Sequence, residues 1–402
     1  MKINETFQTQ VTKECDVFVA GGGIAGISAA LAAAREGAKV ILAEREFALG
    51  GLATAGLITI YLPLCDGMGR QVSFGLAEEL LRLSVKDDLI EDKNPIHWFD
   101  DYDIETRAKA ERYEVRFNAQ YFALLAEKEL LKAGVEILYG TLCCGVDIAD
   151  RHIDHIVCEN KSGRFAVKVG SVVDCTGDAD ICYRAGVATE KFGKGNVLAA
   201  WHYSLSDSEG YKLRMKGAAD VPDEVKNKVD YGEQSLNNKR YSGLDGDELS
   251  GQVIDSHSVM LADIVKARGK DKSYMPVTMP TIPQVRMTRR IVGAYTLDTA
   301  EEHTFVADSI GMVSDWRRRG PVWEVPFGTL YGKDAKNLIT AGRNTSVTDN
   351  MWDVMRVIPC CAVTGQAAGI AAAMTDDFDA LDVTQLQEKL KNAGVILHEK
   401  DL

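Results

Sequence analysis

The sequence predicts an α/β protein: a Rossmann-like domain, with a parallel sheet and a β-meander in its crossover, joined to an α+β domain that caps it. Residues 16–44 have the pattern of a strand, a glycine turn, a helix and a second strand. Residues 135–175 are typical of several short strands, and the alternation of strand and helix is lost between 187 and 328. We therefore expect a discontinuous first domain at 1–57, 111–186 and 329–402, with 58–110 and 187–328 forming the cap.

The glycine turn joins an apolar strand at residues 16–20 to an alanine-rich helix at 27–36. Gly21, Gly23 and Gly26 have the spacing GxGxxG. In this motif the first glycine permits the tight turn, the second lets the backbone approach a pyrophosphate, and the third lets the helix pack closely on the strands. The N–H groups at the start of the helix would face the phosphates, so the segment predicts a dinucleotide site.

Glu44 stands at the end of the second strand, which is expected at residues 39–43. Its carboxylate can accept hydrogen bonds from both hydroxyls of an adenosine ribose, and its charge would repel a 2′-phosphate. A dinucleotide that carries a plain adenosine, either FAD or NAD, is therefore favoured.

The composition limits the partners. The chain has 402 residues, with 46 Lys and Arg against 59 Asp and Glu, and a net charge of −13. An acidic protein repels phosphate backbones and anionic lipid surfaces, so neither a nucleic acid nor a membrane is expected as a partner. The nine cysteines include no CxxC pair, and the N-terminal residues are too polar for a signal peptide. These features predict a cytoplasmic protein with reduced thiols.

The rest of the chain favours FAD over NAD, because an NAD dehydrogenase would normally continue with alternating strands and helices. Instead a small-residue loop follows at residues 50–56, and a late strand at 337–341 runs into Gly342. Glycine turns at widely separated positions of the chain indicate one long ligand that several parts of the chain contact. Between them, short strands are expected near residues 135–139, 142–148, 152–158, 164–169 and 171–175.

Four further motifs are GGLATAG at residues 50–56, TGDAD at 176–180, AGR at 341–343 and RVIPCCAVTGQAAG at 356–369. Together with the glycine turn they resemble the FAD-dependent oxidoreductases of the glutathione-reductase-type flavoprotein superfamily, over nearly the whole chain. In one departure, Arg343 stands where many members of the superfamily have an Asp that binds ribitol. In another, the His that this family often has shortly before the RVxP segment is absent, so no catalytic role can be carried over from it.

The resemblance implies an extended FAD. Its AMP half would lie on the glycine turn, with Arg45 near the adenosine and the strand at 142–144 beside the adenine. The flavin ring would lie between the loop at 50–56 and the helix after Val357, whose N–H groups would stabilise the negative charge of reduced flavin. The expected FAD contacts are Gly21, Gly23, Ile24, Ala25, Gly26, Glu44, Arg45, Gly51, Ala53, Thr54, Cys144, Thr176, Gly177, Asp178, Gly342, Arg343, Val357 and Ile358.

Three residues are candidates for catalysis. Arg356 directly precedes the helix that would face the flavin. Arg289 lies in the arginine-rich segment 283–293, whose guanidinium groups suit a carboxylate but could equally pair with the surplus of Asp and Glu. His202 is the candidate acid or base, and a structural, hydrogen-bonded histidine is the alternative reading. The arginines at 317–319 are expected in a solvated loop.

Other redox groups are not expected. No pair of cysteines has the CxxxxC spacing of flavin disulfide reductases, and no second GxGxxG marks an NAD(P)H domain. Neither a metal site nor an iron–sulfur cluster is indicated. Electrons would therefore enter or leave through a second small molecule, dioxygen or a separate protein.

The sequence thus predicts an FAD-dependent dehydrogenase or reductase that transfers a hydride between flavin N5 and a small organic substrate, anionic or polyhydroxylated. One alternative is an FAD-containing tRNA-modifying enzyme, which the net charge of −13 disfavours. Another is a non-catalytic flavin subunit that passes electrons to an external donor or acceptor. A homo-oligomer is compatible with the sequence.

Overall fold

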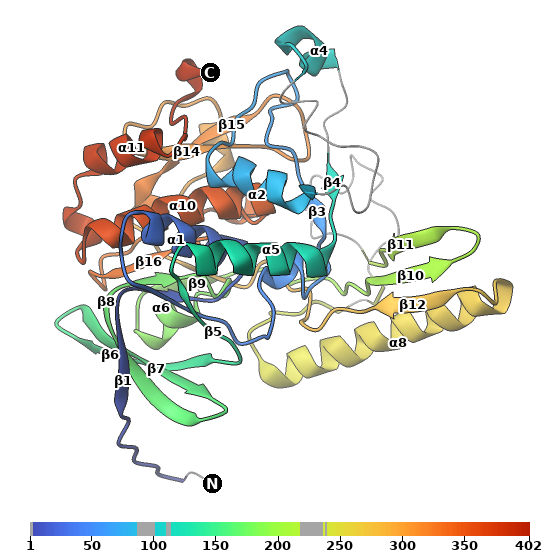
Figure 1. The fold of residues 1–402 in the computed structure, drawn as a ribbon, viewed down its shortest axis with the longest axis horizontal. Helices are drawn as coiled ribbons and strands as arrows, with labels where there is room; N and C mark the ends of the chain where they lie inside the picture. The colour runs from blue at the N-terminus through green and yellow to red at the C-terminus, as the bar shows by residue number, and fades with distance from the viewer. Residues whose placement is uncertain (1–2, 87–100, 110–113, 218–235, 238) are drawn as a thin grey trace.

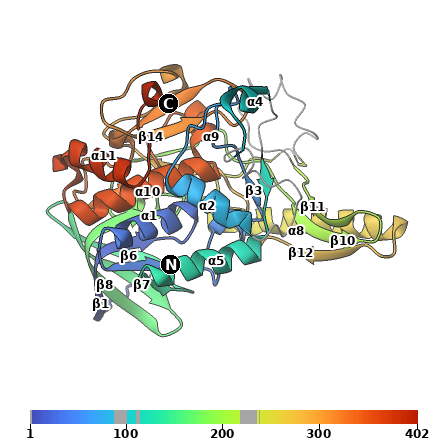
Figure 2. The same cartoon turned by 45° about the horizontal axis from the view of Figure 1, so that its top comes forward.

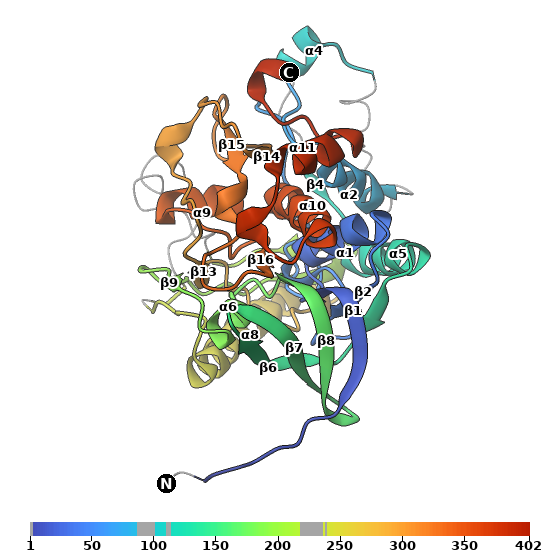
Figure 3. The same ribbon diagram turned by 90° about the vertical axis from the view of Figure 1, so that its left-hand side faces the viewer.

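The centre of the fold is a seven-stranded sheet (Figure 1). The computed structural model describes residues 3–86, 101–109, 114–217, 236–237 and 239–402. Five strands run parallel, in the order β5 (Glu136–Leu138), β2 (Val40–Ala43), β1 (Val11–Ala20), β8 (Gly163–Asp174) and β16 (Leu338–Thr340). β7 (His152–Asn160) and β6 (Leu142–Ala149) continue from β8 as an antiparallel meander, seen side by side in Figure 3. The predicted α/β fold is confirmed.

β8 belongs to both parts of this sheet. Its first half pairs with β7 and its last three residues pair with β16, while β1 runs beside almost its whole length. The sequence predicted two strands here, at 164–169 and 171–175, and this was wrong. The strand runs through Gly170, where β8 comes close to β1: a Cβ there would lie 2.7 Å from the carbonyl oxygen of Asp16.

Two helices cross one face of the parallel sheet in direct contact: α1 (Ile24–Arg35) and α10 (Ile358–Met374). A Cβ on Gly365 would lie 2.4 Å from the carbonyl oxygen of Ala25, and a Cβ on Gly369 would lie 2.2 Å from that of Ala29. The two backbones therefore touch. α10 begins three residues before the predicted Cys361, because Pro359 suits the first turn of a helix.

Further helices complete this layer: α2 (Leu76–Ser84), α5 (Ala119–Lys132) and α11 (Val383–Asn392). Among the described residues, no single helix is long and apolar enough to cross a membrane. α9 (Asp349–Met355) and α10 reach that length and composition together, but they are bent by 90° at their junction.

A second lobe projects beside the sheet (Figures 1 and 2). It contains the long helix α8 (Gly246–Lys270) and a sheet in which β10 (His202–Ser206) lies between β11 (Gly210–Arg214) and β12 (Met275–Thr278). β14 (Ser309–Ser314) and β15 (Val322–Pro326) instead share the hydrophobic core of α1 and α10. The smaller pairs are β9 (Thr189–Lys191) with β13 (Arg289–Ile291), and β3 (Ile60–Tyr61) with β4 (Val115–Arg116).

Candidate cofactor and substrate site

The glycine turn between β1 and α1 is closed on one side and open on the other. Gly21 has φ of +99°, which favours glycine, and a Cβ on Gly26 would lie only 1.9 Å from the carbonyl oxygen of Gly21. A Cβ on Gly23, in contrast, would meet no heavy atom within 4 Å. The open side belongs to a pocket, which Ile24 and Ala25 from the first turn of α1 also line. The N–H groups of a helix's first turn have no partner within the helix, so this end of α1 favours an anion.

Glu44 lies directly after β2, with its carboxylate folded back onto the glycine turn. Oε2 accepts a hydrogen bond from the N–H of Gly22 at 2.7 Å, and Oε1 accepts one from the N–H of Glu46 at 2.8 Å. Burial raises the pKa of Glu44, although these hydrogen bonds and the charge of Arg45 oppose the rise. The carboxylate is thus fixed on the pocket wall, where it can accept a hydrogen bond from a hydroxyl group of a ligand.

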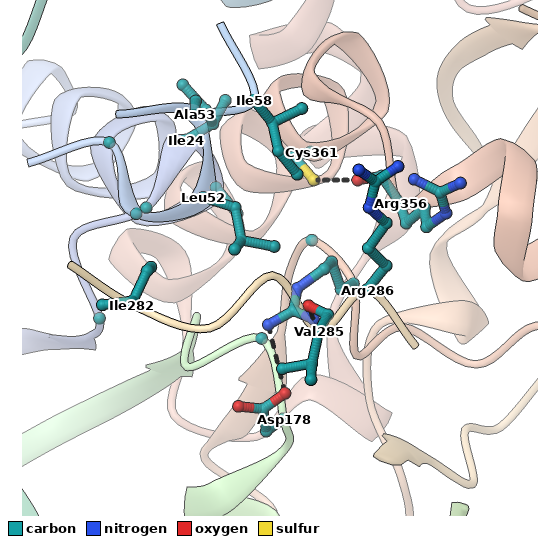
Figure 4. A pocket seen from close by; sticks show the side chains of 18 of the residues that line it. Ile24, Leu52, Ala53, Ile58, Asp178, Ile282, Val285, Arg286, Arg356 and Cys361 are labelled. Carbon is teal, nitrogen blue, oxygen red and sulfur yellow. Dashed lines mark hydrogen bonds and ion pairs between the residues drawn. The ribbon is translucent and has the colours of Figure 1, made fainter. Parts of the chain in front are cut away.

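The pocket has a volume of about 700 Å³ and connects Glu44, past the glycine turn, to the first turn of α10. Figure 4 shows part of its wall, including Leu52, Val285 and Cys361. It brings together residues from the start, middle and end of the chain. The predicted site residues on the wall are Gly21, Gly23, Ile24, Ala25, Glu44, Arg45, Gly51, Ala53, Thr176, Gly177, Asp178, Gly342, Arg343, Arg356, Val357 and Ile358.

The small-residue loop lies directly on the glycine turn. The N–H of Gly50 donates to the carbonyl oxygen of Gly22 at 2.8 Å, and Gly50 has φ of +101°. Thr54 does not line the pocket: its hydroxyl donates to the carbonyl oxygen of Leu49 at 2.5 Å. Thr54 therefore fixes the loop from behind, while residues 50–53 face the pocket.

An ion pair between Asp178 and Arg343 joins two of the predicted motifs. Nη2 of Arg343 lies 3.2 Å from Oδ1 of Asp178, and its Nη1 donates to the carbonyl oxygen of Val285 at 2.7 Å. A Cβ on Gly177 would lie 2.5 Å from Nη2 of Arg343, so glycine at this position leaves room for the guanidinium where it lies. The positive charge of Arg343 is thus compensated by a carboxylate from the TGDAD turn.

Arg286 and Arg356 bring two guanidinium groups to the end of the pocket where α10 begins (Figure 4). Arg286 is 6% exposed. Its Nη2 donates to the side-chain oxygen of Gln284 at 3.2 Å, and its guanidinium carbon lies 5.1 Å from the centre of the Trp201 ring. This end of the pocket is cationic and flanked by an aromatic surface.

A buried cluster of charges holds Arg356. Its Nε donates to Oδ1 of Asp353 at 2.9 Å, and Oδ2 of Asp353 lies 3.2 Å from Nη1 of Arg317. Arg317 is also 2.8 Å from the buried carboxylate of Asp315, and the indole of Trp316 donates to the carbonyl oxygen of Asp353. The prediction of a solvated loop was therefore wrong for Arg317, because its side chain is only 9% exposed.

Residues 16–200 and 196–390 match the sequence model of a family described as FAD dependent oxidoreductase. The chain belongs to this family. It is an oxidoreductase, and FAD is its cofactor. No curated protein matches the sequence significantly.

Solved structures that resemble this oxidoreductase share little sequence with it. A geranylgeranyl bacteriochlorophyll reductase-like protein from Thermoplasma acidophilum is 13% identical, with a TM-score of 0.44 over 95% of this chain and 82% of its own. The open conformation of a flavocytochrome c3 fumarate reductase is 13% identical, with a TM-score of 0.43 over 90% and 79%. A p-nitrophenol 4-monooxygenase from Pseudomonas putida is 11% identical, with a TM-score of 0.42 over 95% and 85%.

Two of the oxidoreductase's predicted catalytic residues lie off the pocket wall. Arg289 begins β13 and pairs with Asp180 at 2.6 Å, with Tyr183 stacked 4.2 Å from its guanidinium. His202 is 1% exposed, and its Nε2 lies 2.8 Å from the hydroxyl of Tyr274. Burial lowers the pKa of His202. Arg289 thus has the contacts of a structural residue, whereas Nδ1 of His202 is buried with no hydrogen-bond partner among the described residues.

Cys144 and Gly26 are the remaining predicted residues that do not line the pocket. Cys143 lines it instead of Cys144, because successive residues of β6 point to opposite faces of the sheet. Gly26 lies on the side of α1 away from the pocket, where the absence of a side chain lets the helix pack against the carbonyl oxygen of Gly21. Within the described ranges, no cluster of three or more His, Cys, Asp or Glu side chains could hold a metal ion.

Sequence reasoning missed Trp201, Trp316 and Lys216, which all line the pocket. Trp201 directly precedes the predicted His202, but it lies just outside β10, so strand alternation does not identify it. Trp316 and Lys216 lie outside any strand or helix, and no periodicity marks them.

Proposed function

We propose that this enzyme transfers a hydride between N5 of FAD and a small, anionic organic substrate. One observation supports this proposal above the others: a single pocket joins the dinucleotide cradle at Gly23 and Glu44 to the two guanidinium groups of Arg286 and Arg356. When bound, FAD would supply the two-electron chemistry. The chain would supply the binding and orientation of the substrate.

The residues on the wall fit an extended FAD of the glutathione-reductase type. The open side of Gly23 leaves room for a pyrophosphate, and the N-terminus of α1 favours its negative charge. The carboxylate of Glu44 would accept hydrogen bonds from the ribose hydroxyls. Val357 and Ile358 place the N-terminus of α10 at the opposite end of the pocket, where it would favour a negatively charged flavin ring.

Arg286 and Arg356 would hold the anionic group of the substrate. Charge-assisted hydrogen bonds from guanidinium are strong where water is excluded, and both side chains are buried or nearly so. Arg356 would also stabilise negative charge that develops during the reaction. Trp201, Lys216 and Arg286 all come from residues 187–328, which supports our proposal that this segment forms the substrate domain.

The test is a screen with the purified enzyme and bound FAD. The flavin is photoreduced without oxygen, and candidate oxidants are added while its absorbance is followed; the reverse screen looks for bleaching of oxidised flavin. Each carboxylate is paired with its methyl ester. We expect a carboxylate to react about tenfold to a hundredfold faster than its ester, because the ester forfeits one or two charge-assisted hydrogen bonds.

Three outcomes would contradict the proposal. If the protein shows no flavin absorbance even after FAD is added, FAD takes no part in the mechanism. Equal rates for acid and ester would remove the anionic substrate. Reoxidation only by a co-purifying protein would favour the electron-transfer subunit instead.

A further inference from the structure

The outer face of α8 carries an apolar stripe that the described part of the chain leaves exposed. Ile254, Leu261 and Val265 are 62%, 63% and 63% exposed. With Gly251 and Ser258, which are also exposed, they occur at alternating intervals of three and four residues. This spacing is typical of a helix that packs lengthwise against another helix.

The opposite face of α8 attaches the helix to the protein. Gln252 and Met260 are buried there, and the hydroxyl of Ser256 donates to the carbonyl oxygen of Ala199 at 2.8 Å. α8 lies along the lower edge of the second lobe in Figure 1. The stripe therefore contributes nothing to holding α8 in place among the described residues.

The two ends of α8 carry opposite charges. Asp247 and Glu248 lie in its first turn, Arg268 and Lys270 lie in its last, and the exposed Lys272 follows. In an antiparallel pair of such helices, the acidic end of each copy lies beside the basic end of the other, and the helix dipoles also oppose. A parallel pair would bring like charges together. Asp247 and Arg268 continue the spacing of the stripe, so the two ends of this face are complementary to each other about a twofold axis.

We propose that α8 docks antiparallel on α8 of a second copy, so that the enzyme is a homodimer with this seam at its twofold axis. One register brings Ile254 of each copy opposite Val265 of the other, and Ser258 opposite Leu261. Gly251 allows close approach near each end. The proposal depends on the exposure and charge of α8 and is independent of the substrate proposed above.

The test uses the full-length enzyme with FAD bound, followed by sedimentation velocity over a dilution series. We expect a dimer that Leu261→Asp weakens about a hundredfold or more, because an unpaired carboxylate would enter the seam. Leu124 on α5 has the same 63% exposure, so Leu124→Asp is the matched control and should leave the dimer unchanged. Flavin absorbance and the thermal midpoint show that each variant is folded.

Charge reversal tests the antiparallel direction. Asp247→Lys and the double variant Arg268→Glu/Lys272→Glu should each weaken the dimer, because each places like charges together at both ends of the seam. An equimolar mixture of the two variants should restore a dimer as tight as the wild type. In the heterodimer, the new lysine of one variant faces the new glutamates of the other, and the opposite end keeps its original pairing. A wild-type monomer at every concentration, a dimer indifferent to Leu261→Asp, or a mixture that fails to recover would each overturn the proposal.

Discussion

Arg356 forms an ion pair with Asp353 at the pocket wall, and the carboxylate of Asp353 is completely buried. The same carboxylate lies 3.2 Å from Arg317, a second buried guanidinium that does not line the pocket. One carboxylate therefore compensates one arginine that faces the pocket and one behind it. Because desolvated charges are stable only while their partners are present, the position of Arg356 depends on this cluster.

Asp353→Asn should lower the free energy of unfolding by about 3–5 kcal/mol, because two buried arginines would lose part of their compensation. Urea unfolding of the FAD-bound enzyme measures the change. Asp376 has a side chain that is 71% exposed, so Asp376→Asn is the control and should stay within about 0.5 kcal/mol of the wild type. Equal stability of the two variants would contradict the buried cluster.

Arg356→Lys should impair substrate binding more than folding. Lysine keeps the positive charge but lacks the planar fork that can contact Asp353 and a substrate carboxylate together. With the substrate found in the screen, we expect KM to rise about tenfold or more while FAD stays bound. Steady-state kinetics measures this, with Arg318→Lys as control, since Arg318 has a side chain that is 58% exposed. An unchanged kcat/KM would remove Arg356 from the substrate site.

Gly23→Val and Gly26→Val should separate cofactor binding from folding. Gly23 has φ of −67°, and a Cβ there meets no heavy atom within 4 Å, so the Gly23 variant should fold but lose FAD. A Cβ on Gly26 would collide with the carbonyl oxygen of Gly21, so the Gly26 variant should lose both fold and FAD. Circular dichroism and flavin absorbance after reconstitution give the two readouts. FAD retained by the Gly23 variant would contradict our placement of the pyrophosphate.

The elements predicted best from the sequence are those whose contacts are local. The strand, turn and helix around Gly21, Gly23 and Gly26 contact one another within thirty residues of chain, so their spacing alone defines their geometry. The phase of a strand is harder to predict, because an error of one residue exchanges the two faces. This explains the choice of Cys144 where Cys143 lines the pocket.

Long-range contacts account for most of what the sequence does not reveal. Arg317 is buried because Asp353, 36 residues later, comes beside it. Arg286 lines the pocket and Arg289 does not, because β13 begins only at Arg289 and residues 283–288 follow an irregular path that no alternation rule describes. Such placements depend on the tertiary fold.

Gly369→Ala should destabilise the enzyme through the contact between α1 and α10. A Cβ there would lie 2.2 Å from the carbonyl oxygen of Ala29, and separating the two helices should cost about 1–3 kcal/mol. Gly269 in the last turn of α8 is the matched control: its Cβ would meet no heavy atom within 4 Å, so Gly269→Ala should be neutral or stabilising by up to about 1 kcal/mol. Thermal and urea unfolding compare the variants. Equal stability would contradict the direct backbone contact.

The stability of the enzyme should depend on pH through Asp180, which lies on the pocket wall. Burial, and then the charges of Asp178 and Asp174, raise the pKa of Asp180 to about 6, while Arg289 opposes the rise. The folded protein therefore holds a proton that the unfolded chain releases at lower pH. Because stability falls with rising pH wherever the folded state binds more protons, this contribution is full below about pH 4 and is lost as pH approaches about 6.

Asp180→Asn should remove this dependence, since its amide does not titrate. We expect the thermal midpoint of the variant, relative to the wild type, to rise between about pH 4 and 6 and to be constant above about pH 7. Scanning calorimetry of both proteins across this range measures the difference, with Asp376→Asn as an exposed control that should follow the wild type throughout. A difference between Asp180→Asn and the wild type that is constant from pH 4 to 7 would show that burial does not hold a proton on Asp180.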